Sequence, residues 1–545
     1  MLRRPVAAGA ILLAAYACLS LLSSPRGFLG TDTGGKVATL EVMTRGPGFR
    51  LDPDIGYWAE EWDPDGSLHP LYYTSRVADG WVNATTLPML LAAAPLYDVG
   101  GYRAALLLPM LGSVTAAFAA RALVRRLRPS DEGHGWVAFW VVGLASPLTV
   151  YALDCWEHSW GAGLIAWGTV LLWDVVRGDR GWRAAGAAGL LLGLSFSLRT
   201  ETLVYVAAGG AAAALALWPS LRNAGGRTAA LGAGTSFAGG FVAIAVANEL
   251  LERVLVGDAI RSSRARGAAA GAGEAAGDRL TEAAYTVVGA TGSTRGVVLG
   301  TLIVVLLAWS LRRGSRDPRF AAAGVVGATL VLLLRFESGL GFVPGLFVAW
   351  PLAVASIALG GWRRWPAAVA LAALPVVLAT QYRGGAAPQW AGRYLLASGL
   401  ILAALGISAL AEQEAAARRA TALLSVLVTA TGVAWLSARS HDVQRTIAAL
   451  EARPEQVIVS AVDHLAREGG ATYGNRRWLT ASSGAQRTEA AEVASAAGAT
   501  SLLFVEVEQA PALDLAAPGW QRGRRERLML FDDVALRLTT WTRSG

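Results

Sequence analysis

An acidic side chain follows shortly after the first apolar run of the chain, in the stretch Gly-Thr-Asp-Thr-Gly-Gly-Lys from Gly30 to Lys36. A carboxylate at the outer face of a membrane is suited to take a proton from an incoming nucleophile. Asp32 is therefore the first candidate for a catalytic base, with Lys36 as a substrate-binding candidate. Thr-Asp-Thr-Gly-Gly is equally typical of a turn or a helix N-cap, so a purely structural interpretation of Asp32 stays open.

Two further groups of charged residues lie where apolar runs meet. Asp154, Glu157 and His158 separate the third run from the fourth, and Arg199-Thr200-Glu201 joins two short runs. Ionisable groups at the edge of a bilayer are costly unless they are paired or functional. We interpret Glu157 as a second catalytic candidate, and His158, Arg199 and Glu201 as substrate-binding candidates. The alternative is that Arg199 and Glu201 form a local ion pair that closes a helix hairpin.

A third feature is the segment 381–394, which ends in Gly-Gly-Ala-Ala-Pro-Gln-Trp-Ala-Gly-Arg-Tyr. Arg393 stands at the mouth of an apolar run, where a guanidinium suits a phosphate that it can bind with two hydrogen bonds. The aromatic residues here are also typical of the belt at a membrane interface. The substrate-binding candidates from this part of the chain are Gln389, Trp390, Arg393 and Tyr394. Glu337, from another outer loop, is a further substrate-binding candidate.

Composition places the chain in the membrane class. Its 545 residues are 54% apolar and only 16% charged, against roughly 25% charged in soluble domains. The net charge of +8 does not indicate nucleic-acid binding, because the arginines form short clusters between apolar runs, the pattern that orients a protein in a bilayer. Lys36 is the only lysine, so no phosphate-binding Gly-x(4)-Gly-Lys motif is available, and the two cysteines are expected to be free.

The apolar runs predict about thirteen transmembrane helices. With the N-terminus in the cytoplasm, every inner loop carries at least two arginines, which makes the count consistent with the orientation rule. The last span then leaves the C-terminal part outside. The predicted spans cover residues 6–22, 104–124, 136–153, 160–176, 184–198, 202–218, 229–250, 296–311, 321–334, 342–359, 366–380, 394–411 and 421–436.

Two domains are expected. Residues 1–437 form an all-α multi-span domain with two large outer loops, 23–102 and a Gly/Ala/Arg-rich one at 251–295, and residues 86–97 form a helix in the interface. Residues 438–545 form a small extracytoplasmic α/β domain. Its predicted strands are 456–460, 501–507 and 534–538, and its predicted helices are 461–467 and 489–497.

The order and sidedness of these motifs resemble the polytopic C-type (GT-C) glycosyltransferases, including bacterial relatives of protein mannosyltransferases and aminoarabinose transferases. The resemblance covers about residues 1–437. It implies transfer of a sugar, with inversion, from a polyprenyl-phosphate donor to a cell-envelope acceptor at the outer face of the plasma (inner) membrane. The acid of the first outer loop, here Asp32, would be the base. Many relatives carry two neighbouring acids there, whereas Thr33 follows Asp32 in this chain. A divalent cation is therefore not supported, and no cofactor or metal ligand is expected.

The resemblance also names the expected partners: a lipid-linked sugar donor, a glycan, lipid or protein acceptor, membrane lipid, and no nucleic acid. Two other classes stay open, a polytopic transporter or flippase of lipid-linked glycans and an oligosaccharide polymerase or ligase. Against a transporter, the charged residues gather at one face rather than at the midplane, and no inverted repeat is detectable.

Overall fold

A computed structural model gives the fold of the chain as two compact units. The membrane unit consists of residues 1–19, 106–251 and 260–435, and the sheet unit consists of residues 20–105, 252–259 and 436–545. The residues that the structure describes are 4–28, 31–44, 52–71, 74–77, 80–83, 86–222, 224–270, 276–290, 294–314, 319, 324, 326, 327, 329, 343–380, 390–510, 517–531 and 534–543.

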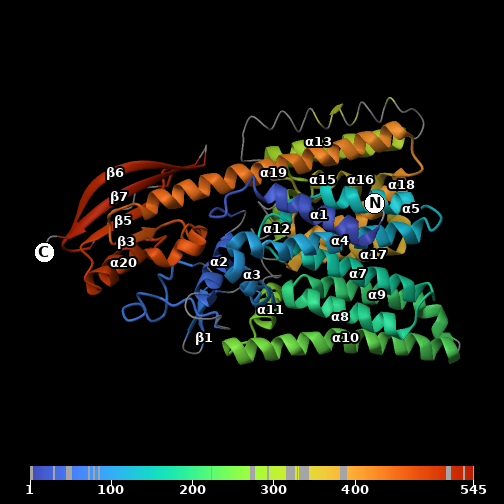
Figure 1. Ribbon diagram of the computed structural model, residues 1–545, viewed down its shortest axis with the longest axis horizontal. Helices are drawn as coiled ribbons and strands as arrows, with labels where there is room; N and C mark the ends of the chain where they lie inside the picture. The colour runs from blue at the N-terminus through green and yellow to red at the C-terminus, as the bar shows by residue number, and fades with distance from the viewer. Residues whose placement is uncertain are drawn as a thin grey trace. The chain divides into compact units, whose positions relative to one another are not determined.

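The membrane unit is helical (Figure 1). Two predicted spans are interrupted: the third is divided between α5 and α6, and the tenth between α15 and α16, where Pro147 and Pro351 begin the second helix of each pair. Its helices are α1 (Pro5–Ser20), α4 (Leu107–Leu127), α5 (Glu132–Leu144), α6 (Pro147–Tyr151), α7 (His158–Val176), α8 (Trp182–Leu198), α9 (Thr202–Leu217), α10 (Ala224–Val256), α11 (Ile260–Ala270), α12 (Ala276–Val288), α13 (Thr294–Gly314), α15 (Leu346–Ala349), α16 (Pro351–Ala358), α17 (Trp365–Thr380), α18 (Leu396–Leu410) and the first part of α19 (Ala415–Glu451), with the short 3-10 helices η1 (Trp218–Arg222), η4 (Gly361–Arg363) and η5 (Arg393–Leu395).

Within the described residues, seven helices are long and apolar enough to cross a membrane, and three shorter helices are also apolar. The structure therefore establishes a largely helical multi-pass protein with a C-terminal sheet domain, while the count of thirteen spans stays a prediction. The predicted ninth span, 321–334, falls almost wholly outside the described residues.

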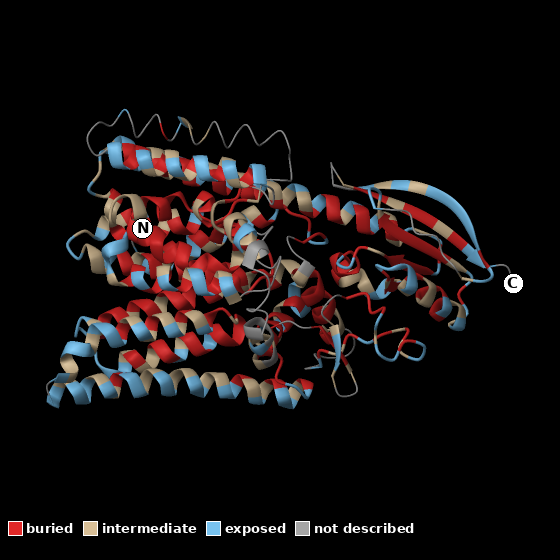
Figure 2. Cartoon of the chain, turned by 180° about the vertical axis from the view of Figure 1, so that it is seen from behind, coloured by how far each residue is buried: buried red, intermediate tan, exposed pale blue. Residues whose placement is uncertain are grey.

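Glycine allows the helices of the membrane unit to approach one another closely. A Cβ atom on Gly189 of α8 would lie 2.1 Å from the carbonyl oxygen of Phe237 in α10, and one on Gly406 of α18 would lie 1.9 Å from that of Leu352 in α16. Close approach of this kind is how helices associate where lipid removes the hydrophobic driving force. Helix α10 keeps an exposed apolar surface, including Leu231 and Val242, as expected of a face in contact with lipid (Figure 2).

The sheet unit contains a five-stranded mixed sheet with the strand order β4-β3-β5-β7-β6. Strand β3 pairs in parallel with β4 and β5, whereas β7 pairs antiparallel with β5 and β6. The elements of this unit are α2 (Thr31–Thr44), β1 (Thr74–Val77), β2 (Gly80–Asn83), α3 (Leu87–Ala105), the end of α19, β3 (Val457–Ser460), η6 (Ala466–Asn475), β4 (Arg477–Thr480), α20 (Gly484–Ala496), β5 (Ser501–Val507), β6 (Trp520–Phe531) and β7 (Val534–Arg543).

Alternation of side chains along the strands gives the sheet two apolar faces. Val457 and Val459 pack with α20, whereas Ile458 packs with the end of α19, and burial on both faces explains why β3 is an unbroken apolar run. The sequence correctly placed β3, β5, the start of β7 and most of α20. It missed β4 and the arginine-rich β6, and residues 461–465, predicted as helix, are bends and turns before η6.

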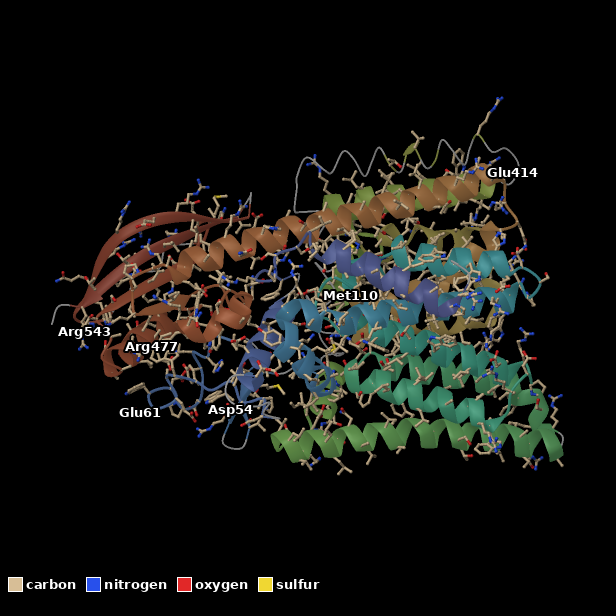
Figure 3. All side chains as sticks on the ribbon, viewed as in Figure 1. Asp54, Glu61, Met110, Glu414, Arg477 and Arg543 are labelled. Atoms are coloured by element: carbon tan, nitrogen blue, oxygen red, sulfur yellow. The ribbon has the colours of Figure 1, made fainter. Side chains whose placement is uncertain are left out.

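The first outer segment packs with the C-terminal sheet in one core, although the sequence grouped it with the membrane helices. Tyr57 and Trp81 are buried together with residues of β3 and α20, and the indole N–H of Trp58 donates to the carbonyl oxygen of Trp478 at 2.8 Å. Asp54, which is labelled in Figure 3, fixes this segment by accepting hydrogen bonds from the backbone N–H groups of Trp81 and Gly56. The tail and the first loop are therefore one structural unit.

The structure also tests two more expectations. The segment 251–295 is not a loop, because it contains the end of α10 and the helices α11 and α12. Its glycines favoured a loop, but alanine and arginine are strong helix formers and together outnumber the glycines. The predicted interfacial helix 86–97 is present as the start of α3, whose backbone breaks at Gly100 and Gly101, the latter with a positive φ of 61°.

Candidate functional site

Asp32 lies in the first turn of helix α2, which begins at Thr31. Of the two structural interpretations left open for this stretch, the start of a helix is close to what is found, and the turn is not. A carboxylate in the first turn is stabilised by the positive end of the helix dipole, typically by about 0.3–1 kcal/mol. Its Oδ1 atom lies 3.4 Å from Nη2 of Arg467, and the Asp32 side chain remains 28% exposed.

Arg467 belongs to η6 in the sheet domain, and its side chain is only 2% exposed. Its Nη2 also donates to the side-chain oxygen of Asn83 at 3.3 Å. A buried guanidinium needs such partners, since removing one partner of a buried ion pair commonly costs about 3–5 kcal/mol. Asp32 is thus held by a cation from the C-terminal part of the chain.

The two glycines of the stretch make this contact sterically feasible. A Cβ atom on Gly34 would lie 1.7 Å from the carbonyl oxygen of Arg467, and one on Gly35 would lie 2.6 Å from the side-chain oxygen of Asn83. They serve close approach between α2 and η6, not a turn. The substrate-binding candidate Lys36, one helical turn beyond Asp32, is 2% exposed.

A second cluster, which we call the Arg199 triad (Glu157, Arg199 and Glu201), is buried in the membrane unit. Arg199 donates from Nη1 to Glu157 at 2.9 Å and from Nε to Glu201 at 2.8 Å. The three side chains are 9%, 5% and 6% exposed in the order Arg199, Glu157, Glu201. They come from the C-terminal end of α8 and the N-terminal ends of α7 and α9, which therefore meet at one end of the unit. The ion pair between Arg199 and Glu201, which was the structural alternative for this hairpin, is present, and Glu157 is a second carboxylate partner of Arg199.

Aromatic rings adjoin the triad. The guanidinium of Arg393 lies 5.6 Å from the ring centre of Trp156 and 4.8 Å from that of Tyr394, and the guanidinium of Arg199 lies 4.9 Å from the ring centre of Tyr394. His158 stacks on Tyr151 with ring centres 5.3 Å apart. Arg393 is half-buried rather than enclosed. The structure therefore brings Glu157, His158, Arg199, Glu201, Arg393 and Tyr394 together.

The backbone before Arg393 is fixed in an unusual conformation. Ala391 and Gly392 both adopt positive φ angles, 63° and 58°, and such a value is uncommon for a residue with a Cβ atom. Hydrogen bonds compensate: the N–H of Ala391 donates to the carbonyl of Pro344 at 2.7 Å, and the carbonyl of Trp390 accepts from the hydroxyl of Tyr151 at 2.6 Å. Strain maintained in this way is frequent at functional sites. It holds Arg393 beside its aromatic neighbours.

The other predicted site residues are not part of this cluster. Glu337 and Gln389 lie outside the described residues. Asp32 and Lys36 belong to the sheet unit, whereas the Arg199 triad and Arg393 belong to the membrane unit. In the part of the chain that the structure describes, no group of three His, Cys, Asp or Glu side chains is arranged to hold a metal ion.

Sequence reasoning missed four residues of these two clusters: Arg467, Asn83, Trp156 and Tyr151. Nothing local marks Arg467, which stands in a tail segment expected to be an ordinary helix. Trp156 had a signal, because it sits between two residues already singled out, Asp154 and Glu157. An aromatic side chain amid charged ones at a span boundary is a sensible candidate for a cation–π partner.

No protein-family model and no curated protein matches the sequence. Among solved structures, the chain is similar to the oligosaccharyltransferase AglB from Archaeoglobus fulgidus, in complex with an inhibitory peptide and a dolichol-phosphate, at 10% identity and a TM-score of 0.42, over 91% of this chain and 69% of that one. It is also similar to ArnT from Cupriavidus metallidurans bound to undecaprenyl phosphate, at 14% identity and a TM-score of 0.43, over 97% of both chains. At these TM-scores no residue roles are carried over.

Proposed function

We propose that this protein is an integral-membrane glycosyltransferase that moves a sugar from a polyprenyl-phosphate donor to a cell-envelope acceptor, with inversion at the anomeric carbon. The observation that carries the proposal is the carboxylate of Asp32, held by the buried Arg467 yet still 28% exposed. An ionised carboxylate that is positioned and accessible is what an inverting transfer requires of its base.

In the proposed reaction, an acceptor hydroxyl attacks the anomeric carbon from the side opposite to the lipid phosphate. The bond between the acceptor oxygen and the anomeric carbon forms, and the bond between that carbon and the phosphate oxygen breaks. The hydroxyl proton passes to Asp32, and the polyprenyl phosphate leaves with the electron pair. Glu157 is the weaker candidate for this role, because it is buried and an acceptor could reach it only by breaking its bond to Arg199.

The departing phosphate needs positive charge, which favours Arg393 over Arg199. Arg199 is already bonded to two carboxylates, so the triad carries no excess positive charge. Arg393 is half-buried, and its guanidinium lies over the rings of Trp156 and Tyr394. Fixed donors near developing charge are typically the largest single contribution to catalysis. We assign the Arg199 triad to holding the ends of three helices and Arg393 to the lipid phosphate.

The location follows from the same proposal. We place the protein in the plasma (inner) membrane, with its N-terminus in the cytoplasm and the sheet domain outside, because lipid-linked sugars of this kind are used at the outer face. The acceptor is a glycan, a lipid or a protein of the cell envelope.

The test is sugar transfer by membranes that contain the full-length chain, measured with radiolabelled polyprenyl-phosphate hexose and pentose probes. Asp32→Asn keeps the size of the side chain but cannot accept the proton, and loss of a general base typically lowers the rate about 10²–10⁴-fold. We expect Asp32→Asn to accumulate normally and to be nearly inactive. Asp52→Asn, in an exposed part of the same unit, is the matched control and should transfer sugar at the normal rate.

Other outcomes would point elsewhere. Normal transfer by Asp32→Asn would return this residue to a structural role. Movement of a lipid-linked glycan across the membrane without any transfer would identify a transporter. A product that forms only when donor and acceptor are both lipid-linked would identify a polymerase or ligase.

A further inference from the structure

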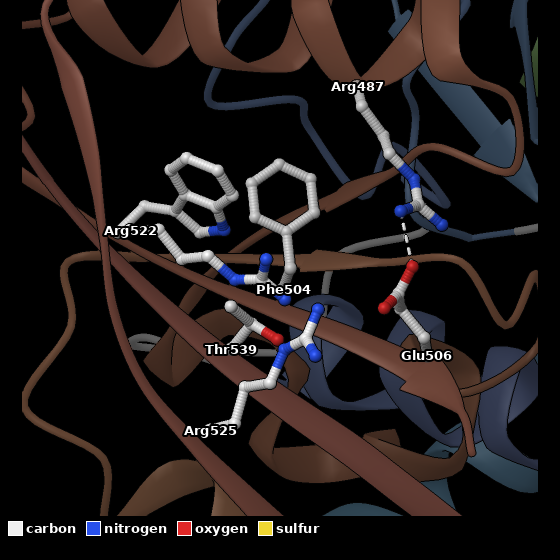
Figure 4. Close-up of a pocket in the computed structure, with 7 residues that line it drawn as sticks. Arg487, Phe504, Glu506, Arg522, Arg525 and Thr539 are labelled. Carbon is white, nitrogen blue, oxygen red and sulfur yellow. Dashed lines mark ion pairs between the residues drawn. The ribbon is translucent and has the colours of Figure 1, made fainter. Parts of the chain in front are cut away.

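The C-terminal sheet carries a basic pocket that the proposed transfer reaction does not use. Its empty volume, the open mouth included, is about 270 Å³. Strands β5, β6 and β7 form its floor, and α20 contributes one arginine from above (Figure 4). The residues that line it are Arg487, Phe504, Glu506, Arg522, Arg525, Thr539 and Trp541.

An irregularity in strand β6 aims two arginines into this pocket. Arg522 pairs with Trp541 and Arg525 pairs with Thr539, so two residues of β6, Gly523 and Arg524, lie opposite the single residue Thr540. In a regular strand, residues three positions apart point to opposite faces. The extra residue in the bulge brings Arg522 and Arg525 to the same face of the sheet, and both guanidinium groups point toward Thr539 (Figure 4). Bulges that re-aim side chains occur preferentially near functional sites.

The described lining of the pocket is rich in arginine. The lining contains three arginines and one acid, Glu506. Glu506 forms an ion pair with Arg487 and accepts from Nε of Arg537 at 2.9 Å, so it already serves two guanidinium groups. Arg487 and Glu506 are each 5% exposed on their side chains, which makes this pair a rigid base for the pocket.

The shape and chemistry of the lining indicate the ligand. Arginine presents a planar fork that matches a phosphate with paired hydrogen bonds, and the Thr539 hydroxyl adds another donor. Phe504 and Trp541 supply apolar walls beside these donors. We propose that this pocket binds a phosphate group, carried either by a small soluble molecule or by the headgroup of a lipid. The proposal does not depend on glycosyl transfer, because Asp32 and Arg393 take no part in it.

The experiment measures binding of inorganic phosphate to the full-length chain in a maltoside detergent, by line broadening in phosphorus NMR. Arg525→Ala should weaken binding about tenfold, the loss expected for one charge-assisted contact. The double variant Arg522→Ala/Arg525→Ala should abolish it. Arg524→Ala removes a neighbouring arginine whose side chain is 80% exposed and does not line the pocket, and it should change binding less than about twofold.

Two further arms identify the source of the phosphate. A short-chain phosphatidic acid that binds more tightly than glycerol phosphate indicates a lipid headgroup, and equal binding indicates a soluble ligand. Arg525→Lys keeps the charge but loses the fork, so it should recover only part of the affinity. The proposal is overturned if phosphate does not bind, or if Arg524→Ala weakens binding as much as Arg525→Ala. Sugar transfer should be normal in Arg525→Ala, which separates this test from that of the proposed function.

Discussion

Arg199 and Arg393 both lie at helix ends of the membrane unit, but their surroundings differ, and so do the tasks that we assign to them. Arg199 has two carboxylate partners within 2.9 Å and is nearly enclosed. Arg393 rests against aromatic faces and is half-buried. Because Arg393 is the more accessible of the two and is the residue that we assign to the lipid phosphate, its replacement should affect catalysis directly.

Arg393→Lys should lower the rate of sugar transfer although the charge is retained, because lysine loses both the bidentate fork and the planar contact with Trp156 and Tyr394. Arg393→Ala should cost about 2 kcal/mol of transition-state stabilisation, or roughly thirtyfold in rate. Arg363→Lys is a matched control, since Arg363 also lies against a tryptophan but is exposed at a different helix end. If Arg393→Ala transfers sugar at the normal rate, the assignment to the phosphate is wrong.

His69 should make the sheet unit sensitive to acid. Its ring is buried between Tyr57 and Trp81, and its Nδ1 accepts a hydrogen bond from the N–H of Leu71, which only the neutral ring can do. Burial is the main cause that lowers the pKa of His69 from 6.5 to about 4. A lowered pKa means that the unfolded state takes up the proton first as the pH falls.

The stability due to neutral His69 should therefore be complete above pH 6.5 and decrease progressively as the pH falls toward 4. Over that interval the loss is on the order of 3 kcal/mol in the free energy of unfolding. The measurement is the unfolding midpoint of the full-length chain at each pH, for wild type and for His69→Gln. The variant should have a flatter pH profile, and His441→Gln, at an exposed histidine, should keep the wild-type profile. Parallel profiles for wild type and His69→Gln would contradict this account.

At the level of elements, the fit of helix α2 against η6 is the contact on which the Asp32 site depends. Gly34 faces the backbone of Arg467 with no room for a Cβ atom, so Gly34→Ala must push the two elements apart. Overpacking of this kind costs about 1–3 kcal/mol, and it should also remove Arg467 from Asp32. We expect earlier thermal unfolding and reduced sugar transfer. Gly484→Ala, where a Cβ atom would meet nothing within 4 Å, should leave both unchanged.

Sequence patterns predicted the elements best where burial is uniform. Strand β5 was predicted at the residues the structure gives, because a run that is buried on both faces is plainly apolar. Strand β6 was missed, since it is an edge strand with four arginines, and its pairing with β7 rather than its own composition makes it a strand. The helices α11 and α12 were missed because glycine was given more weight than the surrounding alanine.

The candidate site was predictable to a similar extent. Residues close together at span boundaries were found, since neighbouring helix ends must meet: Glu157, Arg199 and Glu201 do. The partner of Asp32 was not found, because Arg467 comes from the far end of the chain and only the tertiary fold brings it to α2. No periodicity or motif encodes such a long-range contact.

At the level of the whole molecule, each unit is assembled from distant stretches of chain. The membrane unit consists of three separate stretches of the chain, and the sheet unit consists of three others. The tail therefore cannot be regarded as an appended module, because the first outer segment completes its core and Asp32 depends on its Arg467. A variant that lacks residues 438–545 would lose the partner of Asp32 along with the sheet.

Charge in the membrane unit is arranged by side. Arg126, at the end of α4, binds Asp174 of α7 through two hydrogen bonds of 2.6 and 2.7 Å. Arg128 forms an ion pair with Glu412, just beyond α18, at 3.1 Å. The opposite ends of α7 and α18 carry Glu157 and the η5 segment of Arg393. Arginine-rich ends are retained in the cytoplasm during insertion, so we predict that the end with Arg126 and Arg128 is the inner one.

The orientation can be tested with alkaline phosphatase, which is active only outside the cytoplasm. Fusions after Arg128 and after Arg364 should be inactive, since both positions follow arginine-rich helix ends. A fusion after Glu451, where α19 ends, should be active, because it places the enzyme on the side of the sheet domain and of Asp32. Matched fusions to a fluorescent protein that folds only in the cytoplasm should show the reverse pattern. An active phosphatase after Arg364 would contradict this orientation. The carboxylate of Asp32 would then face the cytoplasm, where an acceptor from the cell envelope could not reach it.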